Sequence, residues 1–144
     1  MATSLSILLN RFIRSLTQNR AQDVFGDNPL VVPVPLHPRR LRWRGFNQSE
    51  LLAESLAEHF LLQTDALTLN RVRQTMPQAD IQEREQRLDN VSDVFSCAHP
   101  ENVRGRSILL IDDVCTTGAT LNECARVLKE NGAKRVVALV VARG

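Results

Sequence analysis

Residues 108 to 121 read Ile108-Leu-Leu-Ile-Asp-Asp-Val-Cys-Thr-Thr-Gly-Ala-Thr-Leu121. The apolar residues of Ser107 to Ile111 predict a buried strand, and helical spacing predicts a helix over Thr117 to Asn131 that Gly132 stops. A second apolar strand is expected over Arg135 to Val141. Because both strands are apolar at nearly every position, we expect a parallel sheet covered on two faces. The pattern predicts an α/β fold.

The loop between this strand and helix has the composition of a phosphate cradle. Gly118 lets the backbone turn tightly, threonine hydroxyls donate hydrogen bonds, and the N-terminus of the helix adds positive potential. The residues expected to surround the phosphate are Cys115, Thr116, Thr117, Gly118, Ala119 and Thr120. The chain has no G-x-x-x-x-G-K-[ST] motif and no G-x-G-x-x-G motif, which disfavours a nucleoside triphosphatase and a dinucleotide oxidoreductase.

Two carboxylates, Asp112 and Asp113, stand where the predicted strand ends, and ligands of open α/β sheets bind at that edge. They can accept hydrogen bonds from the vicinal hydroxyls of a ribose, directly or through Mg²⁺. They would also stabilise positive charge that develops on the sugar as a bond at its C1 breaks. The alternative is an ordinary turn with an Asp/Thr helix cap, but the acids, threonines and glycine together exceed what a cap needs. We therefore predict a sugar-phosphate site with Asp112 and Asp113 as catalytic and Mg²⁺-binding residues.

The remaining elements are predicted from apolar periodicity and capping residues. Asn47 followed by Glu50 is a capping pair at the start of a helix. Pro33 and Pro35 limit the strand before it. The expected helices cover Thr3 to Gln18 and Asn47 to about Leu62, and the expected extended segments are Leu30 to Val34, Ala66 to Val72 and Val94 to Ser96.

Four arginines, Arg39, Arg40, Arg42 and Arg44, fall within six residues. Charge runs of this kind are usually solvated turns, but they also bind anions, including the backbone of a nucleic acid. The residues alone leave these alternatives open.

The segment from Arg73 to Asn90 sustains neither a helical nor a strand period, which predicts a long mobile loop. Loops of this length are often functional lids. The polar residues that could close over a ligand are Thr75, Gln78, Arg84 and Arg87. They are equally compatible with ordinary loop residues, and both interpretations stay open.

Composition indicates one aliphatic-cored domain over residues 1–144. The 18 basic residues nearly balance the 16 acidic ones, so the net charge of +2 does not itself draw the chain to a polyanion. The three cysteines form no C-x-x-C pair, which argues against a disulfide framework and a structural zinc site. The N-terminus lacks a signal peptide, and no apolar run approaches the roughly 20 residues of a membrane span. We expect a cytoplasmic protein without membrane insertion.

The central motif, four apolar residues, two acids and a Thr-Thr-Gly-x-Thr loop, closely resembles the phosphoribosyl pyrophosphate motif of type I phosphoribosyltransferases. Other parts of the chain are similar to the ComF/GntX family, namely Pro33-Val-Pro35, Arg44-Gly-Phe-Asn-Gln48 with Leu51 and Leu52, and the series Thr75, Gln78, Arg84, Arg87, Asn90 and Phe95. The resemblance implies a type I phosphoribosyltransferase-like fold, with a mainly parallel sheet flanked by helices and a mobile lid loop. It also implies an association of some members with DNA uptake or competence.

The same resemblance assigns the loop after the first strand to the diphosphate of the ligand. The residues carried over to that diphosphate loop are Arg39, Arg40, Arg44, Gly45, Asn47 and Gln48. Similar proteins carry an N-terminal zinc module with four cysteines and a preceding strand, which this sequence lacks. That part lies where related enzymes hold the acceptor base, so the acceptor is not predicted.

Two functions are expected from these residues. The first is a Mg²⁺-dependent phosphoribosyltransferase that binds phosphoribosyl pyrophosphate and releases diphosphate. The second is a module for DNA uptake that senses phosphoribosyl pyrophosphate or a nucleotide without turnover, while its basic loop contacts single-stranded DNA or a competence protein. Release of diphosphate in the presence of candidate bases separates the first function from the second.

Overall fold

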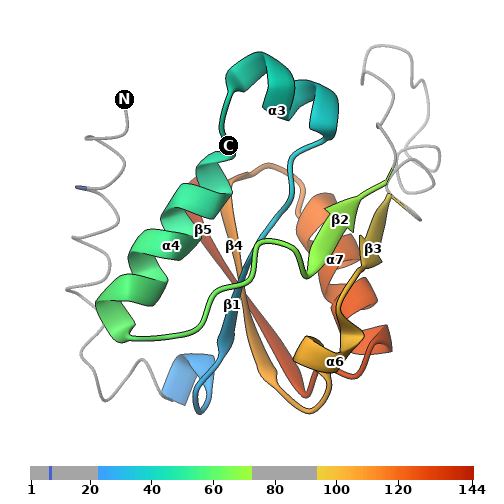
Figure 1. The fold of residues 1–144 in the computed structure, drawn as a ribbon. Coiled ribbons are helices and arrows are strands. Elements are labelled where there is room, and N and C mark those ends of the chain that lie inside the picture. Colours follow the sequence, from blue (N-terminus) through green and yellow to red (C-terminus); the bar gives the residue numbers. More distant parts are fainter. Residues whose placement is uncertain (1–6, 8–22, 73–93) are drawn as a thin grey trace.

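A computed structural model describes residue 7 and residues 23–72 and 94–144 (Figure 1). At its centre three parallel strands lie in the order β1 (Leu30–Pro33), β4 (Ser107–Cys115), β5 (Arg135–Arg143). The register places Pro33 beside Ile111. Because the strands are parallel, the carboxyl ends of β1 and β4 meet at one edge of the sheet.

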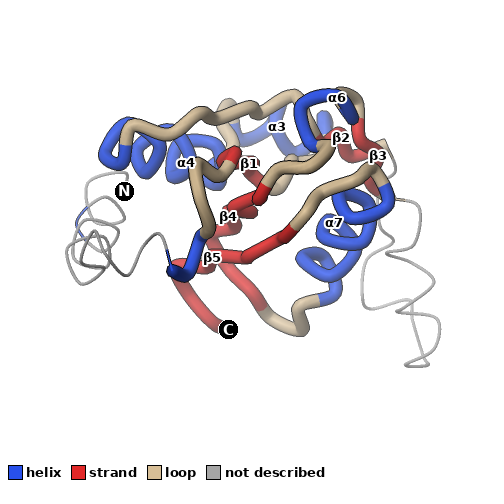
Figure 2. Tube along the Cα trace, turned by 90° about the horizontal axis from the view of Figure 1, so that it is seen from below, coloured by secondary structure: helices blue, strands red, loops and turns tan. Residues whose placement is uncertain are grey.

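Two helices cover opposite faces of this sheet, α4 (Gln48–Phe60) on one and α7 (Ala119–Glu130) on the other (Figure 2). Alternate residues of the central strand divide between the two resulting cores, as side chains of a strand must. Leu109 and Ile111 pack with the α4 residues Leu52 and Leu56. Ile108 and Leu110 pack with the α7 residues Leu121 and Leu128. The predicted α/β fold with a helix-flanked parallel sheet is confirmed.

A small antiparallel pair lies on the α7 side of the sheet. It consists of β2 (Leu69–Arg71) and β3 (Phe95–Cys97), and a short helix, α6 (Pro100–Val103), follows it. Leu69 and Phe95 are buried in the same core as α7. The two weak extended segments predicted from the sequence are therefore real strands, and they pair with each other.

The structure corrects three local expectations. The central strand continues four residues beyond Ile111, to Cys115. The basic run expected as a turn or loop forms a helix, α3 (Pro38–Arg44), because the His37 ring accepts a hydrogen bond from the Arg39 N–H and proline occupies its first turn. The last strand, β5, was expected to be covered on two faces, but as an edge strand of the described sheet it buries only Leu139.

Two predicted segments lie outside the described residues. They are the helix over Thr3 to Gln18, apart from Ile7, and the loop over Arg73 to Asn90 with Thr75, Gln78, Arg84 and Arg87. In the part of the chain that is described, none of the helices has the length and apolar character needed to cross a membrane.

Candidate functional site

The sequence motifs meet where β1 and β4 end. β1 leads through residues 34–37 into α3, and β4 leads through residues 116–118 into α7 (Figure 1). Since β1 and β4 are adjacent and parallel, both connections leave from the same edge of the sheet. The structure therefore brings the arginine-rich α3, the acid pair and the threonine loop to one edge.

Asp112 is the more buried of the two acids, with 9% of its surface exposed. Its Oδ1 accepts a hydrogen bond from the Ser49 hydroxyl at 3.1 Å and another from the Asp113 N–H at 2.9 Å. Burial, followed by the neighbouring Asp113 carboxyl, raises the pKa of Asp112 to about 6. The sheet edge thus holds a carboxyl group that changes its charge near neutral pH.

Asp113 is half-buried and differs from Asp112 in its surroundings. The two acids are consecutive residues of β4, and a side-chain hydrogen bond between their carboxyl groups contributes to the raised pKa of Asp112. Asp112 alternates with Ile108 and Leu110 on the α7 face. Asp113 is accordingly the acid with the more accessible carboxylate, and Asp112 is the one held by the protein.

The threonine loop is shorter than the sequence suggested. Only residues 116–118 separate β4 from α7, so Cys115 ends the strand, and Ala119 and Thr120 open the helix. Gly118 precedes the helix with φ of 80°, a left-handed conformation that residues with a side chain rarely adopt. The Ala119 N–H donates to the Thr117 hydroxyl at 3.3 Å. No side chain caps α7 at Gly118, and the helix N-terminus offers N–H groups to an anion.

The basic residues predicted to hold diphosphate lie on an exposed helix. Arg39, Arg40 and Arg44 are exposed on α3, which buries no residue, and Gly45 ends it with φ of 81°. His37, which caps α3, has a lowered pKa because of desolvation, followed by the positive charges of nearby arginines. The helix therefore presents a cationic surface beside the acid pair.

Asn47 has a different environment from these arginines. It is 7% exposed, its Nδ2 donates to the Val34 carbonyl at 3.1 Å, and its Oδ1 accepts from the Ser49 N–H at 3.2 Å. Gln48 follows as the half-buried first residue of α4. Asn47 thus caps α4 and ties it to the end of β1, which in turn positions Ser49 against Asp112.

Arg71 on β2 belongs to this edge, although the sequence did not single it out. Its guanidinium lies 5.5 Å from the centre of the Phe95 ring, its partner in the β2–β3 pair. Desolvation, followed by the charge of Arg40, lowers its pKa, while Cys124 and Asp112 raise it. Nothing in a short, weakly patterned strand signals this placement, because it arises from packing the β2–β3 pair over α7.

The acids at this edge could provide only part of the coordination of a Mg²⁺ ion. Within residues 23–72 and 94–144, no group of three or more His, Cys, Asp and Glu side chains converges. A magnesium ion is usually bound by one or two carboxylates and completes its coordination with water and ligand oxygens. Asp112 and Asp113 would supply that minimal set, and an ion bound there would need further oxygens from water or from a phosphorylated ligand.

The chain matches known proteins over this part of its sequence. The family model described as phosphoribosyl transferase domain matches residues 47–144. DNA utilization protein YhgH of Salmonella typhi is 42% identical over 106 residues, which are 74% of this chain and 45% of that protein. Competence protein F of Haemophilus influenzae is 33% identical over 114 residues (78% and 49%), and competence protein ComFC of Bacillus subtilis is 38% identical over 106 (72% and 39%). The chain thus spans less than half the length of these curated relatives.

Solved structures agree on the fold. The glutamine phosphoribosylpyrophosphate amidotransferase of B. subtilis, solved with ADP and GMP, superposes with a TM-score of 0.58 at 21% identity, covering 97% of this chain and 26% of that one. A second structure, titled the allosteric regulatory enzyme of purine biosynthesis, gives a TM-score of 0.57 at 20% identity, covering 97% and 25%. Together with the matches in sequence, this fold shows that the chain belongs to the ComF family of proteins with a phosphoribosyltransferase-type domain.

Proposed function

We propose that this chain binds phosphoribosyl pyrophosphate and transfers its phosphoribosyl group, with release of diphosphate. The observation that carries the proposal is the meeting of three features at one sheet edge: the acid pair of β4, the threonine loop before α7, and the cationic α3. These three features can bind the ribose, the phosphate and the diphosphate, respectively, of a sugar that carries a phosphate at one end and a diphosphate at the other.

Each part of the ligand is assigned to a different segment. The 5′-phosphate binds at residues 115–120, where Gly118 turns the backbone and the N-terminus of α7 points at an anion. Asp113 accepts hydrogen bonds from the ribose hydroxyls, and Asp112 orients the backbone beside it. Arg39, Arg40 and Arg44 neutralise the diphosphate. Asp112 and Asp113 would hold Mg²⁺, and the bound ion would supply positive charge that offsets the negative charge of the leaving diphosphate.

The transfer itself needs little from the protein beyond charge and position. The bond between C1 and the diphosphate oxygen breaks with its electron pair on the oxygen, and an acceptor then bonds to C1. Positive charge on the ring is stabilised by the nearby carboxylates, and negative charge on the diphosphate by α3. No nucleophilic side chain is required, which agrees with Cys124, whose pKa is raised by burial.

Binding is tested by calorimetry with phosphoribosyl pyrophosphate and Mg²⁺. We expect Asp113→Asn to weaken binding by about tenfold or more, since a charged hydrogen-bond acceptor contributes about 1.5–3 kcal/mol. Glu123→Gln, a substitution of another acid outside the edge, serves as the control. Equal affinities of the wild type and Asp113→Asn would refute the assignment. Appearance of diphosphate when candidate bases are added then tests turnover.

The alternative function is a sensing module in DNA uptake. It is favoured by the names of the relatives, DNA utilization protein and competence protein, and by Trp43, which is 85% exposed among the arginines of α3. Exposed aromatic rings beside cations are typical of surfaces that bind single-stranded nucleic acid. Under this function ligand protects the chain from thermal unfolding without turnover, and Trp43→Ala weakens binding of single-stranded DNA or of a competence protein. Release of diphosphate would reject it in favour of the transferase.

A further inference from the structure

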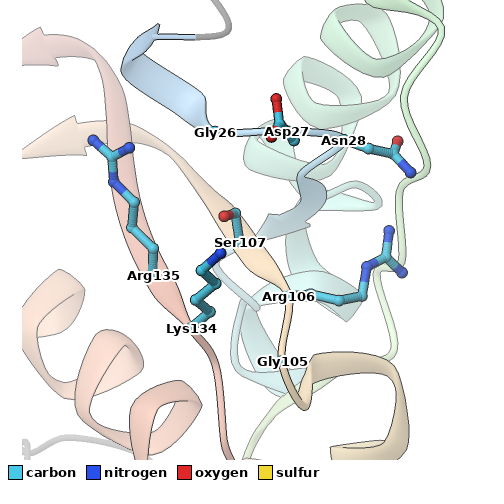
Figure 3. A pocket seen from close by; sticks show the side chains of 8 residues that line it. All are labelled: Gly26, Asp27, Asn28, Gly105, Arg106, Ser107, Lys134 and Arg135. Atoms are coloured by element: carbon cyan, nitrogen blue, oxygen red, sulfur yellow. The ribbon is translucent and has the colours of Figure 1, made fainter.

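A second feature of the structure lies at the opposite edge of the sheet. A cavity of about 540 Å³ opens there between the turn at residues 26–28 and the residues that lead into β4 and β5, 105–107 and 134–135 (Figure 3). These are the amino ends of the parallel strands β4 and β5, whereas the candidate site lies at the carboxyl ends of β1 and β4. The cavity is therefore separated from that site by the length of the sheet.

Cations dominate the side chains of this cavity. Arg106, Lys134 and Arg135 come from the entries of two strands, and Asp27 is the single acid among the lining residues. In Figure 3, Lys134 extends toward Ser107, Arg106 and Arg135 lie on its two sides, and the carboxylate of Asp27 points away from them. The lining includes no aromatic or aliphatic side chain. Its chemistry suits an anion and offers no surface for stacking a base.

The walls of the cavity are fixed by hydrogen bonds rather than by side-chain packing. The Gly105 N–H donates to the Gly132 carbonyl at 2.8 Å, and the Lys134 N–H donates to the Arg106 carbonyl at 2.9 Å. Arg106 also donates from Nη2 to Gln63 at 3.0 Å, and its guanidinium has four further N–H donors. The backbone entries to β4 and β5 are thus joined, so the three cations project from a fixed backbone framework.

Gly26 sets the opposite wall. Its φ is 83°, and a Cβ added to it would come within 2.7 Å of the Ser107 hydroxyl. Only glycine combines that conformation with that close approach. The turn at residues 26–28 consequently lies directly against the start of β4, where Ser107 lines the cavity and Lys134 extends toward it (Figure 3).

We propose that this cavity is a second phosphate-binding site, for a ligand with two or more phosphate groups. Three cations on separate backbone positions exceed what one phosphate requires, and the volume lies within the range of small-ligand sites, about 300–1,000 Å³. Arg106 binds one phosphate through its remaining donors, and Lys134 and Arg135 bind another. The ligand is either the polyphosphate group of a small molecule or successive phosphates of a nucleic-acid strand. The site is independent of the proposed phosphoribosyl site.

The site is tested with inorganic triphosphate, titrated by calorimetry into the full 144-residue chain in magnesium-free buffer. We expect Lys134→Gln and Arg135→Gln each to weaken binding about tenfold, the loss of one charge-assisted hydrogen bond. Arg126→Gln removes one cation from α7 outside the cavity and should change affinity less than twofold. Both pocket residues are exposed, so the variants should fold, and thermal unfolding verifies that they do.

A second measurement locates the ligand without substitutions. Adding triphosphate should shift the amide NMR signals of Gly105 and Lys134 more than those of Thr116 to Thr120. The double variant Arg39→Gln/Arg40→Gln removes two exposed α3 cations that are assigned to the diphosphate at the other edge. It should keep its affinity for triphosphate, which distinguishes failure of this site from failure of the phosphoribosyl site. Unchanged affinity in both pocket variants, an equal loss in Arg126→Gln, or amide shifts confined to Thr116 to Thr120 would overturn the proposal.

The source of the phosphate groups is decided by a parallel titration with a labelled oligodeoxythymidylate. If a strand occupies the site, Lys134→Gln lowers the slope of log affinity against log salt by about 0.7, the value for one phosphate contact of a single strand. If a small molecule occupies it, triphosphate binding falls and strand binding does not. Either result supports a phosphate site. If Lys134→Gln weakens binding of neither triphosphate nor the oligodeoxythymidylate, the proposal is rejected.

Discussion

Asp112 is a residue whose burial lowers the stability of the fold at neutral pH. Its folded-state pKa of about 6 lies above the ordinary value of 3.8. Between these two values the folded protein keeps the proton and the unfolded chain loses it. The free energy of unfolding therefore decreases as pH rises from about 4 to 6, and the penalty persists above that range.

Asp112→Asn should remove this penalty. The amide oxygen can still accept from the Ser49 hydroxyl and the Asp113 N–H, and no charge is buried. We expect the variant to unfold at a higher temperature than the wild type at pH 8 and at the same temperature at pH 3.5. Calorimetric scans across this range provide the comparison. A variant that is less stable at pH 8 would show that the ionised carboxyl is favoured by its surroundings.

Arg71 contributes both a positive charge and a contact with the Phe95 ring, and two substitutions can separate these contributions. Arg71→Lys keeps the cation but loses the guanidinium over the Phe95 ring, and Arg71→Met removes the cation while retaining an extended side chain. If the charge contributes to anion binding at the edge, Arg71→Met should weaken binding of phosphoribosyl pyrophosphate about tenfold and Arg71→Lys much less. Equal affinity in all three proteins would restrict Arg71 to packing.

At the scale of elements, the start of α4 links the fold to the site. Asn47 joins the helix to the end of β1, and two residues later Ser49 reaches Asp112. Helix α3 lies between β1 and this cap and buries nothing, so its position depends on the two ends that hold it. The connection explains why the Arg-Gly-Phe-Asn-Gln motif combines a cationic segment with a buried amide.

Substitutions at Asn47 separate its two hydrogen bonds. Asn47→Asp keeps the oxygen that caps α4 but cannot donate to the Val34 carbonyl, and Asn47→Ala loses both contacts. We expect Asn47→Ala to lower the free energy of unfolding by about 2 kcal/mol, with Asn47→Asp in between. Urea denaturation measures both. Identical losses would mean that the cap contributes nothing beyond the link to β1.

At the scale of the whole molecule, the sheet separates the two proposed anion-binding sites. Six residue steps along β4, from Ser107 to Asp113, correspond to about 20 Å. The candidate site lies at the carboxyl edge, beside α3, and the proposed phosphate cavity lies at the amino edge, below β4 and β5 (Figures 1 and 3). The two edges share the strand but no side chain.

Because the two edges are far apart, substitutions at one edge and at the other should have additive effects on the free energy of unfolding. Combining Asp113→Asn with Lys134→Gln should change the free energy of unfolding by the sum of the single effects to within about 0.5 kcal/mol, because distant sites without shared partners are independent. Affinity for phosphoribosyl pyrophosphate should follow Asp113 alone. Denaturation of the four proteins of this cycle measures the first quantity and calorimetry the second. A coupling well above that margin would indicate that β4 transmits a change between the edges.

Short-range patterns in the sequence were sufficient to predict the helix-flanked parallel sheet and the motif at the end of β4. The unbroken apolar run of Ile108 to Ile111, the cap at Asn47 and the turn at Gly118 are short-range patterns, and the structure agrees with each of them. The acid pair and the threonine loop could be proposed as one site for the same reason. They are neighbours in sequence and must emerge together from one strand.

Only the tertiary structure decided which distant residues join that motif and which edge they occupy. The burial of Asp112 against Ser49, the position of Arg71 over Phe95 and the gathering of Arg106, Lys134 and Arg135 all connect segments that no local pattern relates. The same holds for β5, whose apolar sequence suits a covered strand although it lies at the edge of the described sheet. Side-chain periodicity encodes which faces are apolar, whereas the neighbours of a face depend on how the whole chain packs.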